Sequence, residues 1–413
     1  MNRTNYIIIF LITGLFLSGC DKGANEERQR KKDEQFHQKL LTIDTHADTP
    51  LMMLRRGWDI SIRNDPGKRG GKIDFPRMKE GGLDGVFFAV YTGQGPHDQQ
   101  GIEHARQEAS ELFDTIHAVI KRYSDMVQLG LTSDDLEIIN KNGRLAIFIG
   151  MENGYPIGKD LSLVKEYYDL GTRYITLCHS SNNDICDSST DRDGSEHEGL
   201  SAFGEEMVKE MNRLGIIIDL SHASDETFYD VLRLSQAPVI ASHSGARAIL
   251  NHPRNLNDSM LLSLAEKNGV IQVCLVGEYV RETEPFPERD SARMAVVRKY
   301  GRYDELSDEA KEAFLRDSFA VDSIFPPHLP TVSDFVDHID HIVEVAGIDH
   351  VGIGSDFDGG GALEDCYDVS EMDNITYELL RRGYSKEEIR KIWSGNFLRV
   401  FREVERVSRE IGK

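Results

Sequence analysis

The chain alternates between short apolar runs and longer segments whose apolar residues recur at helical spacing. Eight runs rich in Val, Ile and Phe each stop at a cluster of polar residues; in chain order they read "LLTIDTHAD", "GVFFAVYT", "RLAIFIGMEN", "YITLCHSSN", "IIIDLSHAS", "PVIASHS", "GVIQVCLVG" and "HVGIGSDFDG". Continuous apolar runs bounded by turns are typical of strands that are buried on both faces of a parallel sheet. The pattern therefore predicts eight such strands.

Helix-like segments separate most of these runs. They read "GIEHARQEASELFDTIHAVIKRY", "SAFGEEMVKEMNRLG", "SDETFYDVLRLS", "SMLLSLAEKNG" and "TVSDFVDHIDHIVEVAG". Eight alternations of strand and helix predict an α/β fold, and specifically a (β/α)8 TIM-type barrel. A doubly wound open sheet is the alternative, but that fold usually carries a Gly-rich loop after its first strand, and no G-x-G-x-x-G follows the first run here.

Two long inserts and a closing helix complete the predicted barrel. Residues 55–80 form a polar insert after the first strand, and residues 278–330 form a longer one after the seventh, partly helical and then Pro-rich. Loops on the carboxyl face of a barrel build its active site, so both inserts could cover one. At the C-terminus, Ser385 and Glu388 predict a capping box at the start of a packed closing helix.

The N-terminus is typical of an export signal. Arg3 precedes "YIIIFLITGLFLS", an apolar run of 13 residues that is short for a membrane span. The following "LSGC" resembles a bacterial lipobox, which implies cleavage before Cys20 and lipidation of its sulfur; an uncleaved anchor or a plain signal peptide is the alternative. We expect a lipoprotein signal peptide over residues 1–19, a charged tether over 20–37 and the barrel over 38–413, held outside the cytoplasm in a bacterial cell envelope.

Charge and cysteine content exclude some function classes. The net charge of the 413-residue chain is -22, and such an acidic surface repels phosphate backbones, so we expect no nucleic-acid partner. The spacing of the other four cysteines fits neither a zinc knuckle nor a C-x-x-C redox pair. Cys178 and Cys274 lie inside apolar runs and are expected to be buried thiols, although a bridge between Cys178 and Cys186 remains an alternative.

Polar residues of metal-binding type follow six of the eight predicted strands. They are His46, Asp48, Glu152, His179, His222, His243 and Asp356. In a barrel every strand opens onto the same face, so we expect these side chains to converge although they are far apart in sequence.

The types of these side chains indicate hydrolytic metal chemistry. Imidazoles with two or three carboxylates suit Zn²⁺ best, with Mn²⁺, Co²⁺ or Fe²⁺ as alternatives. A single glutamate, Glu152, among the other ligands suggests a carboxylate that bridges two ions, and two metals can share a hydroxide and polarise a carbonyl. Taken singly, each residue has a structural alternative, such as a turn for Asp356 in "GSDFDGG". His338 and His341 could form a second site but are better explained by a solvated helix face.

Long motifs give the chain a family resemblance. "IDTHADTP", "GMENGYPI", "RYITLCHSSNN", "GLSAFGEEMVKEMNRLGIIIDLSHAS", "APVIASHSGARAI", "HPRNLND" and "VGIGSDFDG" resemble the membrane (renal) dipeptidase family of zinc peptidases, within the metal-dependent amidohydrolase group. The resemblance runs in order from about residue 40 to the C-terminus. It implies two zinc ions per chain, a dipeptide substrate cleaved by a zinc-bridged hydroxide, tolerance of a D-residue at the C-terminal position, and a homodimer.

The resemblance also implies a role for each residue. His46 and Asp48 would bind the more buried zinc, and Glu152 would bridge both ions. The second zinc would be held by His222 and His243. In the substrate pocket, His179 would stabilise the oxyanion, Arg254 would hold the free carboxylate of the dipeptide, and Asp356 would move the proton from the water to the leaving amine. A guanidinium fork matches a carboxylate well, and a carboxylate beside the metals is a sound acid and base.

Some positions depart from the family pattern. Glu152-Asn153-Gly154 stands where Glu-Gly-Gly is common, and the insert over residues 278–330 is longer than in the animal enzymes. These differences concern the substrate pocket more than the metals. Two alternatives remain: another amidohydrolase-type activity on a lactone, a phosphotriester or a deaminase substrate, and a binding lipoprotein on a retired enzyme scaffold. His-x-Asp in the first strand and a bridging glutamate disfavour the first, and the full set of expected residues disfavours the second.

Overall fold

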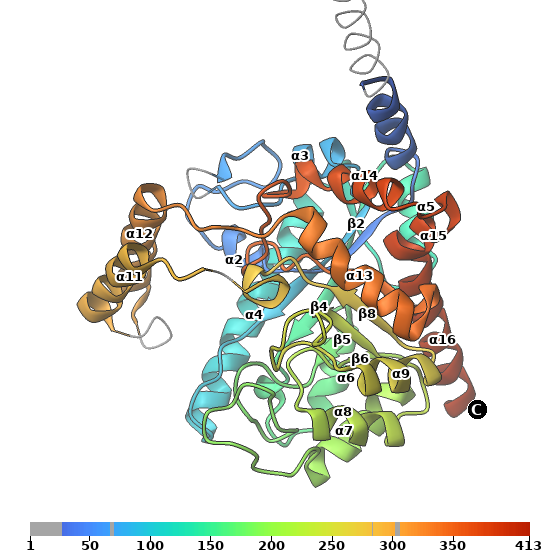
Figure 1. Ribbon diagram of the computed structural model, residues 1–413. Helices are drawn as coiled ribbons and strands as arrows, with labels where there is room; N and C mark the ends of the chain where they lie inside the picture. Colours follow the sequence, from blue (N-terminus) through green and yellow to red (C-terminus); the bar gives the residue numbers. More distant parts are fainter. Residues whose placement is uncertain (1–26, 67–69, 283, 302–305) are drawn as a thin grey trace, which may run out of the picture.

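Eight parallel strands wind around a common axis in the computed structural model, with helices on the outside (Figure 1). The structure describes residues 27–66, 70–282, 284–301 and 306–413. The predicted signal peptide over residues 1–19, Cys20 and the first part of the tether therefore lie outside the described residues.

The strands confirm the predicted (β/α)8 TIM-type architecture. Neighbours in the sheet follow the order β1-β2-β4-β5-β6-β7-β8-β9, and every pairing is parallel. Their bounds are β1 Ile43–Ala47, β2 Gly85–Tyr91, β4 Leu145–Glu152, β5 Thr172–Thr176, β6 Ile217–Asp219, β7 Ile240–Ser244, β8 Val270–Val273 and β9 Val351–Ile353. Seven of them lie within the predicted apolar runs, and β5 begins two residues before its run. A ninth strand that the sequence did not predict, β3 (Val127–Leu129), pairs with the first residues of β4.

The barrel closes between β1 and β9 at its carboxyl end. Ala47 and Phe357 form a parallel bridge, and the Asp48 amide donates to the Phe357 carbonyl at 2.9 Å. The Asp356 amide donates to the His46 carbonyl at 3.0 Å. Closure therefore brings His46 and Asp48, at the end of β1, next to the loop after β9.

Side chains on the two faces of the strands fill two separate cores. Phe87 and Phe148 point into the barrel, where their rings lie 5.0 Å apart. Phe397, from the closing helix, packs 5.3 Å from the Phe87 ring and fills the amino end of the barrel. The alternate residues Phe88 and Ile147 pack outward against the helices. Burial on both faces explains why the strands have continuous apolar runs.

Helices surround this sheet. The major ones are α4 Gln99–Arg122, α5 Asp135–Lys141, α6 Ser162–Asp169, α7 Ala202–Leu214, α8 Asp225–Leu234, α9 Asp258–Glu266, α13 Val332–Ala346, α14 Asp373–Arg381, α15 Lys386–Arg390 and α16 Asn396–Ile411. The five predicted helical segments correspond to α4, α7, α8, α9 and α13. The capping box of Ser385 and Glu388 is present at the start of α15, and a π-helical turn, Lys391–Gly395, joins α15 to α16.

Both inserts lie at the carboxyl face. The first insert is mostly loop, between α2 (Pro50–Met53) and the end of α3 (Phe75–Glu80). The second begins with the short α10 (Gly277–Val280) and then forms α11 (Pro287–Tyr300) and α12 (Asp308–Ile324). The part of this insert that was predicted to be helical corresponds to α12, whereas α11 was not predicted. Figure 1 shows α11 and α12 standing side by side, away from the barrel.

The described part of the predicted tether differs from a solvated chain. Residues 27–37 are helical, and Phe36 and His37 are buried. His37 Nδ1 lies 2.7 Å from Thr376 Oγ1 in α14, and its Nε2 lies 2.7 Å from the Gly81 carbonyl oxygen. The end of this segment is therefore packed on the barrel domain. Within the described ranges, the helices are all too short or too polar to cross a lipid bilayer.

Candidate metal centre

All seven metal-type residues lie together at the carboxyl mouth of the barrel. His46 is in β1, Glu152 is the last residue of β4, and His243 is in β7. The others follow strands directly: Asp48 after β1, His179 after β5, His222 after β6 and Asp356 after β9. Convergence therefore follows from the barrel topology, as the sequence predicted.

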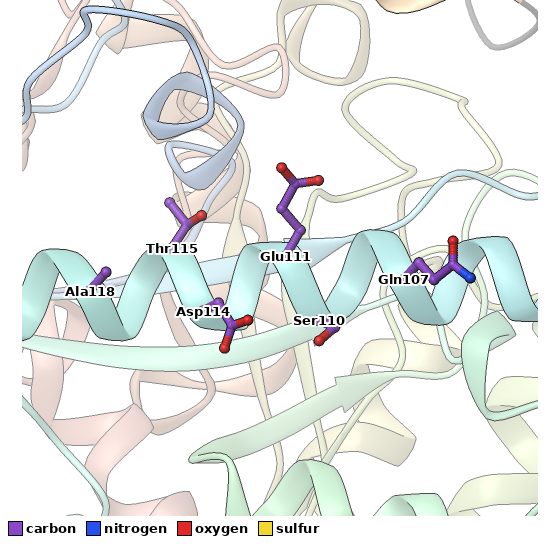
Figure 2. Close-up of a pocket in the computed structure, with 6 residues that line it drawn as sticks. All are labelled: Gln107, Ser110, Glu111, Asp114, Thr115 and Ala118. Atoms are coloured by element: carbon purple, nitrogen blue, oxygen red, sulfur yellow. The ribbon is translucent and has the colours of Figure 1, made fainter.

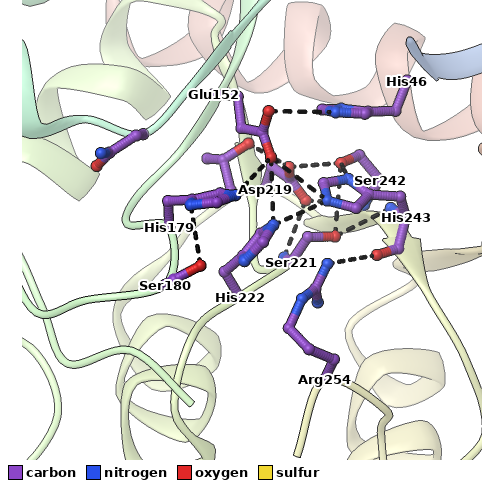
Figure 3. Close-up of polar contacts among 12 residues, drawn as sticks. His46, Glu152, His179, Ser180, Asp219, Ser221, His222, Ser242, His243 and Arg254 are labelled. Atoms are coloured by element: carbon purple, nitrogen blue, oxygen red, sulfur yellow. Dashed lines mark hydrogen bonds and ion pairs between the residues drawn. The ribbon is translucent and has the colours of Figure 1, made fainter. Parts of the chain in front are cut away.

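Glu152 is at the centre of the cluster (Figure 3). Its Oε1 lies 3.2 Å from His222 Nε2 and 3.6 Å from both His179 Nε2 and His243 Nε2. Its Oε2 lies 3.4 Å from His46 Nε2. One carboxylate thus faces four imidazoles, two on strands and two on loops.

Three overlapping groups have ligand atoms within 4.8 Å of one another. They are His46, Glu152 and His243; Glu152, His179 and His222; and His46, Asp48 and Asp356. Because Glu152 and His46 each belong to two groups, the three groups form one continuous cluster. This cluster is large enough for two neighbouring ion sites. Asp356, expected as a proton carrier, lies close enough to His46 and Asp48 to serve as a ligand as well.

Unsatisfied polar atoms show that the residues fit divalent cations. His46 Nε2, Asp48 Oδ1 and Glu152 Oε2 are buried and have no hydrogen-bond partner among the described residues. Burial raises the pKa of Glu152 to about 8, and burial together with the Glu152 charge raises that of Asp48. Burial likewise raises the pKa of Asp356 to about 7. Buried acceptors and carboxylates without donors are costly unless a cation neutralises them.

The histidines are held in a ligating form. Burial, with nearby positive charge, lowers the pKa of His222 and His243 well below the usual value, so both are neutral. Their Nε2 atoms approach to 3.0 Å (Figure 3). Neutral imidazole is the form that binds a metal, through whichever nitrogen carries no proton.

Hydroxyl groups contact the Nδ1 atoms of two of the imidazoles, and one of them fixes the tautomer. Ser242 Oγ lies 2.6 Å from Asp219 Oδ2, to which it donates, and 2.8 Å from His243 Nδ1, from which it can then accept. Tyr174 Oη lies 2.8 Å from His46 Nδ1. Nε2 of His243 is therefore left free for a cation, and Nε2 of His46 is free when Tyr174 accepts from Nδ1. Sequence reasoning missed these three partners; the one available signal was Asp219, an acidic residue in an otherwise apolar strand.

Glycines make room for this arrangement. A Cβ on Gly150 would lie 2.1 Å from the Tyr174 ring, so only glycine lets that ring cross the barrel to His46. A Cβ on Gly359 would lie 2.1 Å from both Asp48 Oδ2 and Asp356 Oδ1. Gly359 is a further site residue that sequence reasoning did not single out.

The backbone is strained at two site residues. His222 has φ 71° and Asp356 has φ 57°, in the left-handed region that residues with a Cβ adopt at a cost. Two hydrogen bonds to Asp44 in β1 hold the loop that carries Asp356. Asp44 Oδ1 accepts from the Ser355 amide at 2.8 Å, and Asp44 Oδ2 accepts from Ser355 Oγ. Such strain persists where surrounding bonds determine the conformation, as they do here.

His179 and Arg254 lie at the edge of the cluster. His179 is partly exposed, and burial together with the Arg254 charge lowers its pKa to about 3, so it is neutral. Its Nδ1 lies 3.0 Å from Ser180 Oγ, which can donate to it and leave a proton on Nε2. Arg254 is buried and donates to the His243 carbonyl at 3.0 Å, while its Nε has no partner among the described residues.

Other candidates from the sequence have structural roles. His338 is buried, not solvated as expected: its Nδ1 accepts from the Ala246 amide and its Nε2 lies 2.9 Å from the Val280 carbonyl. His341 pairs with Asp258 at the surface. Cys178 and Cys186 are buried free thiols in this structure.

A hollow on the outside of the barrel carries no comparable chemistry. Figure 2 shows its lining side chains, all from α4: Gln107, Ser110, Glu111, Asp114, Thr115 and Ala118. Since a single helix supplies every one of them, no groups from different elements converge there.

Comparisons with known proteins agree with this geometry. A sequence model of the family described as membrane dipeptidase (peptidase family M19) matches residues 30–413. Dipeptidase verJ of Clonostachys rogersoniana is 34% identical over 382 residues, which cover 89% of this chain and 84% of the relative. Dipeptidase tcpJ of Claviceps purpurea is 32% identical over 373 residues, covering 88% and 77%.

Solved structures show the same fold. The probable dipeptidase PvdM from Pseudomonas aeruginosa superposes with a TM-score of 0.79 at 28% identity, over 92% of this chain and 99% of that one. A metallopeptidase from Rhodobacter sphaeroides, solved with a phosphinate mimic of the dipeptide L-Ala-D-Ala, has a TM-score of 0.71 at 25% identity, over 88% and 99%.

Proposed function

Because the chain belongs to the membrane dipeptidase family, peptidase family M19, and is a hydrolase of the metallopeptidase class, we propose that it cleaves dipeptides with two zinc ions at the mouth of its barrel. The observation that carries the proposal is the convergence of one buried carboxylate, Glu152, with four imidazoles at 3.2–3.6 Å. Imidazole and carboxylate donors together suit Zn²⁺.

The metal ligands are assigned to five residues. His46 and Asp48 would hold one ion, His222 and His243 the other, and Glu152 would contact both. The buried unpartnered atoms of His46, Asp48 and Glu152 support this assignment. Bound there, the ions would acidify a water molecule and polarise the substrate carbonyl.

Arg254 would set the length of the substrate. Its guanidinium is buried at the mouth, and its Nε is a donor without a partner among the described residues. A free carboxylate of a dipeptide would accept from this group, since a guanidinium fork matches a carboxylate in geometry and charge. The Arg254 guanidinium carbon also lies 5.2 Å from the centre of the Tyr279 ring, which limits its movement.

His179 and Asp356 would handle charge and protons. A neutral His179 with its proton on Nε2 would donate to the oxygen of the scissile carbonyl as negative charge develops there. Asp356 would take a proton from the attacking water and return it to the leaving amine. Its position beside His46 and Asp48 supports this role.

Acceptance of a D-residue at the second position of the dipeptide is also proposed. It is supported by the Rhodobacter metallopeptidase, whose bound phosphinate mimics L-Ala-D-Ala. Because D-residues are unusual in proteins, cleavage of such dipeptides would connect the enzyme to dipeptides released from cell-wall material.

Mass-spectrometric profiling of metal-replete protein tests the function. We expect cleavage of L-Ala-L-Ala and L-Ala-D-Ala, whereas the first peptide bond of the tripeptide L-Ala-L-Ala-L-Ala should stay intact, because the C-terminal carboxylate lies one residue too far from that bond. Asp356→Asn is the control and should bind zinc without turnover. Hydrolysis of a lactone or a phosphotriester in place of dipeptides would overturn the proposal.

We propose that the enzyme is anchored in the cell envelope by lipid on Cys20. The support is the lipobox-like "LSGC" after an apolar run. Cys20→Ala should move the protein from the membrane fraction to the soluble fraction without changing its kcat. Membrane association that persists in this variant would contradict the anchor.

A further inference from the structure

Asn153, directly after Glu152, is a buried polar residue at the mouth to which the proposed function gives no role. Its φ is 78°, in the left-handed region that glycine adopts without strain. An asparagine in this conformation keeps its side chain at a conformational cost, and such a cost is typical of positions with a functional constraint. The contacts of the side chain therefore indicate what it does.

The carboxamide of Asn153 makes hydrogen bonds to three segments at the mouth. Its Nδ2 donates to the Thr92 carbonyl at 3.0 Å and to Gln94 Oε1 at 3.4 Å, both in the loop after β2. Its Oδ1 accepts at 3.1 Å from the Tyr155 amide, in the turn after β4, and at 3.1 Å from Asn183 Nδ2, in the loop after β5. These four bonds use both donors and both acceptor positions of the amide.

Two of these segments also support His179. Asn183 Nδ2 donates to the Leu177 carbonyl as well, at 2.9 Å, which fixes the backbone two residues before His179. The ring of Tyr91, at the end of β2, lies edge-on against the His179 imidazole, with the ring centroids 4.9 Å apart. The backbone and the ring of His179 are therefore each supported by a segment that is bonded to the carboxamide of Asn153.

His179 depends on such support because it is the most exposed imidazole of the cluster. Its side chain is 22% exposed, whereas those of His46, His222 and His243 are 0%, 6% and 1% exposed. A hydrogen-bond donor stabilises a developing negative charge well only where its position is fixed before the reaction. The loops around His179 must provide that rigidity.

We propose that Asn153 is a positioning residue: its carboxamide joins the loops after β2 and β5 and thereby holds His179 in place beside the scissile carbonyl. The inference rests on the proposed function, from which it takes the role of His179. It extends that function by assigning the placement of His179 to a residue outside the five proposed metal ligands.

Steady-state kinetics of the zinc-loaded full chain on L-Ala-L-Ala test this role. Asn153→Gly keeps the left-handed backbone and removes all four side-chain hydrogen bonds. We expect kcat to fall about tenfold or more, with KM changed by less than about threefold and bound zinc unchanged, because His179 acts mainly in the transition state. The matched control is Asn268→Gly, which makes the same replacement at another left-handed asparagine (φ 57°), before β8 at the amino end of the barrel, and should leave kcat unchanged.

A double-mutant cycle separates positioning from a purely structural role. In the His179→Ala background, Asn153→Gly should lower kcat by less than about twofold, because the group through which it acts is absent. A purely structural residue would lower the Tm and change kcat by the same factor in both backgrounds. Equal factors in the two backgrounds, or an unchanged kcat in Asn153→Gly alone, would overturn the proposal.

Hydrogen exchange measured by mass spectrometry gives a readout that does not depend on activity. Amides of residues 92–95 and 177–186 should exchange about fivefold faster or more in Asn153→Gly than in wild type, and at the wild-type rate in Asn268→Gly. Unchanged exchange in both loops would overturn the inference whatever the activity. A wild type that cleaves no dipeptide would overturn the proposed function, whereas faster exchange in both loops would still support the link through Asn153.

Discussion

Gly359 shows how little room the site leaves around its carboxylates. A methyl group there would lie 2.1 Å from oxygens of both Asp48 and Asp356, so Gly359→Ala must displace them. We expect a loss of about 100-fold or more in kcat/KM, since a shift of about 1 Å can cost that much, together with weaker zinc binding. Gly360→Ala is the control, because its Cβ would approach only Val276, at 3.2 Å. Equal effects of the two changes on activity and zinc content would contradict this account.

Ser242 transmits the charge of Asp219 to His243. Without the hydroxyl, the His243 Nδ1 proton loses its acceptor and the ring loses its fixed tautomer. Ser242→Ala should therefore lower zinc affinity by about 10- to 100-fold while kcat at saturating zinc changes much less. Competition with a zinc chelator measures the affinity directly. An unchanged affinity would show that Ser242 plays no part in holding the ligand.

Ligand types could be predicted from the sequence, but their supporting contacts could not. His46, Glu152 and His222 are recognisable because polar residues at the ends of apolar runs must share the barrel mouth. Tyr174 is different: it contacts His46 across the barrel only because Gly150 leaves space for its ring. Contacts of this kind depend on the register of strands that are distant in sequence, and no local pattern encodes them.

At the scale of elements, Asp84 links the start of β1 to the start of β2. It accepts from the Thr42 amide at 3.0 Å and from Asn140 in α5, yet burial raises its pKa to about 6. In the unfolded chain this carboxyl titrates near 4, so the folded state binds the proton more tightly. Protonated Asp84 therefore stabilises the fold at pH 4, and this stabilisation is lost as the pH rises through 6.

Replacing Asp84 should remove that pH dependence. We expect the unfolding free energy of Asp84→Asn, relative to wild type, to rise by about 1–2 kcal/mol between pH 4 and pH 7, the lower figure allowing for partial solvent screening. Urea unfolding with a chelator present, at the two pH values, gives this difference without interference from metal binding. A relative stability that is the same at both pH values would contradict the assigned pKa.

Strands proved easier to predict than short helices. All eight barrel strands coincide with apolar runs, because burial on both faces leaves a continuous signal. The three-residue β3 and the helix α5, which begins at Asp135, were missed because neither is long enough to show a period. α11 was missed for another reason: it has no continuous apolar stripe, in keeping with its position beside α12 and away from the barrel.

At the scale of the whole molecule, we expect metal binding and barrel closure to be coupled. The mouth holds Asp48, Glu152 and Asp356 buried near one another, and the backbone bonds that close β1 on β9 involve two of them, Asp48 and Asp356. Removing the ions leaves these carboxylates facing each other without compensation. Dialysis against a chelator should therefore abolish activity and lower the Tm by several degrees, and added zinc should restore both. A chelated protein that keeps its Tm would contradict this coupling.

The central claim is that five residues from the ends of four strands hold two cations with Glu152 between them. Anomalous diffraction at the zinc edge, from crystals of the zinc-loaded chain, tests it most directly. We predict two zinc peaks per chain at the barrel mouth, one against each oxygen of the Glu152 carboxylate, and the loss of at least one of them in Glu152→Gln. A single peak, or peaks that do not touch Glu152, would contradict the account.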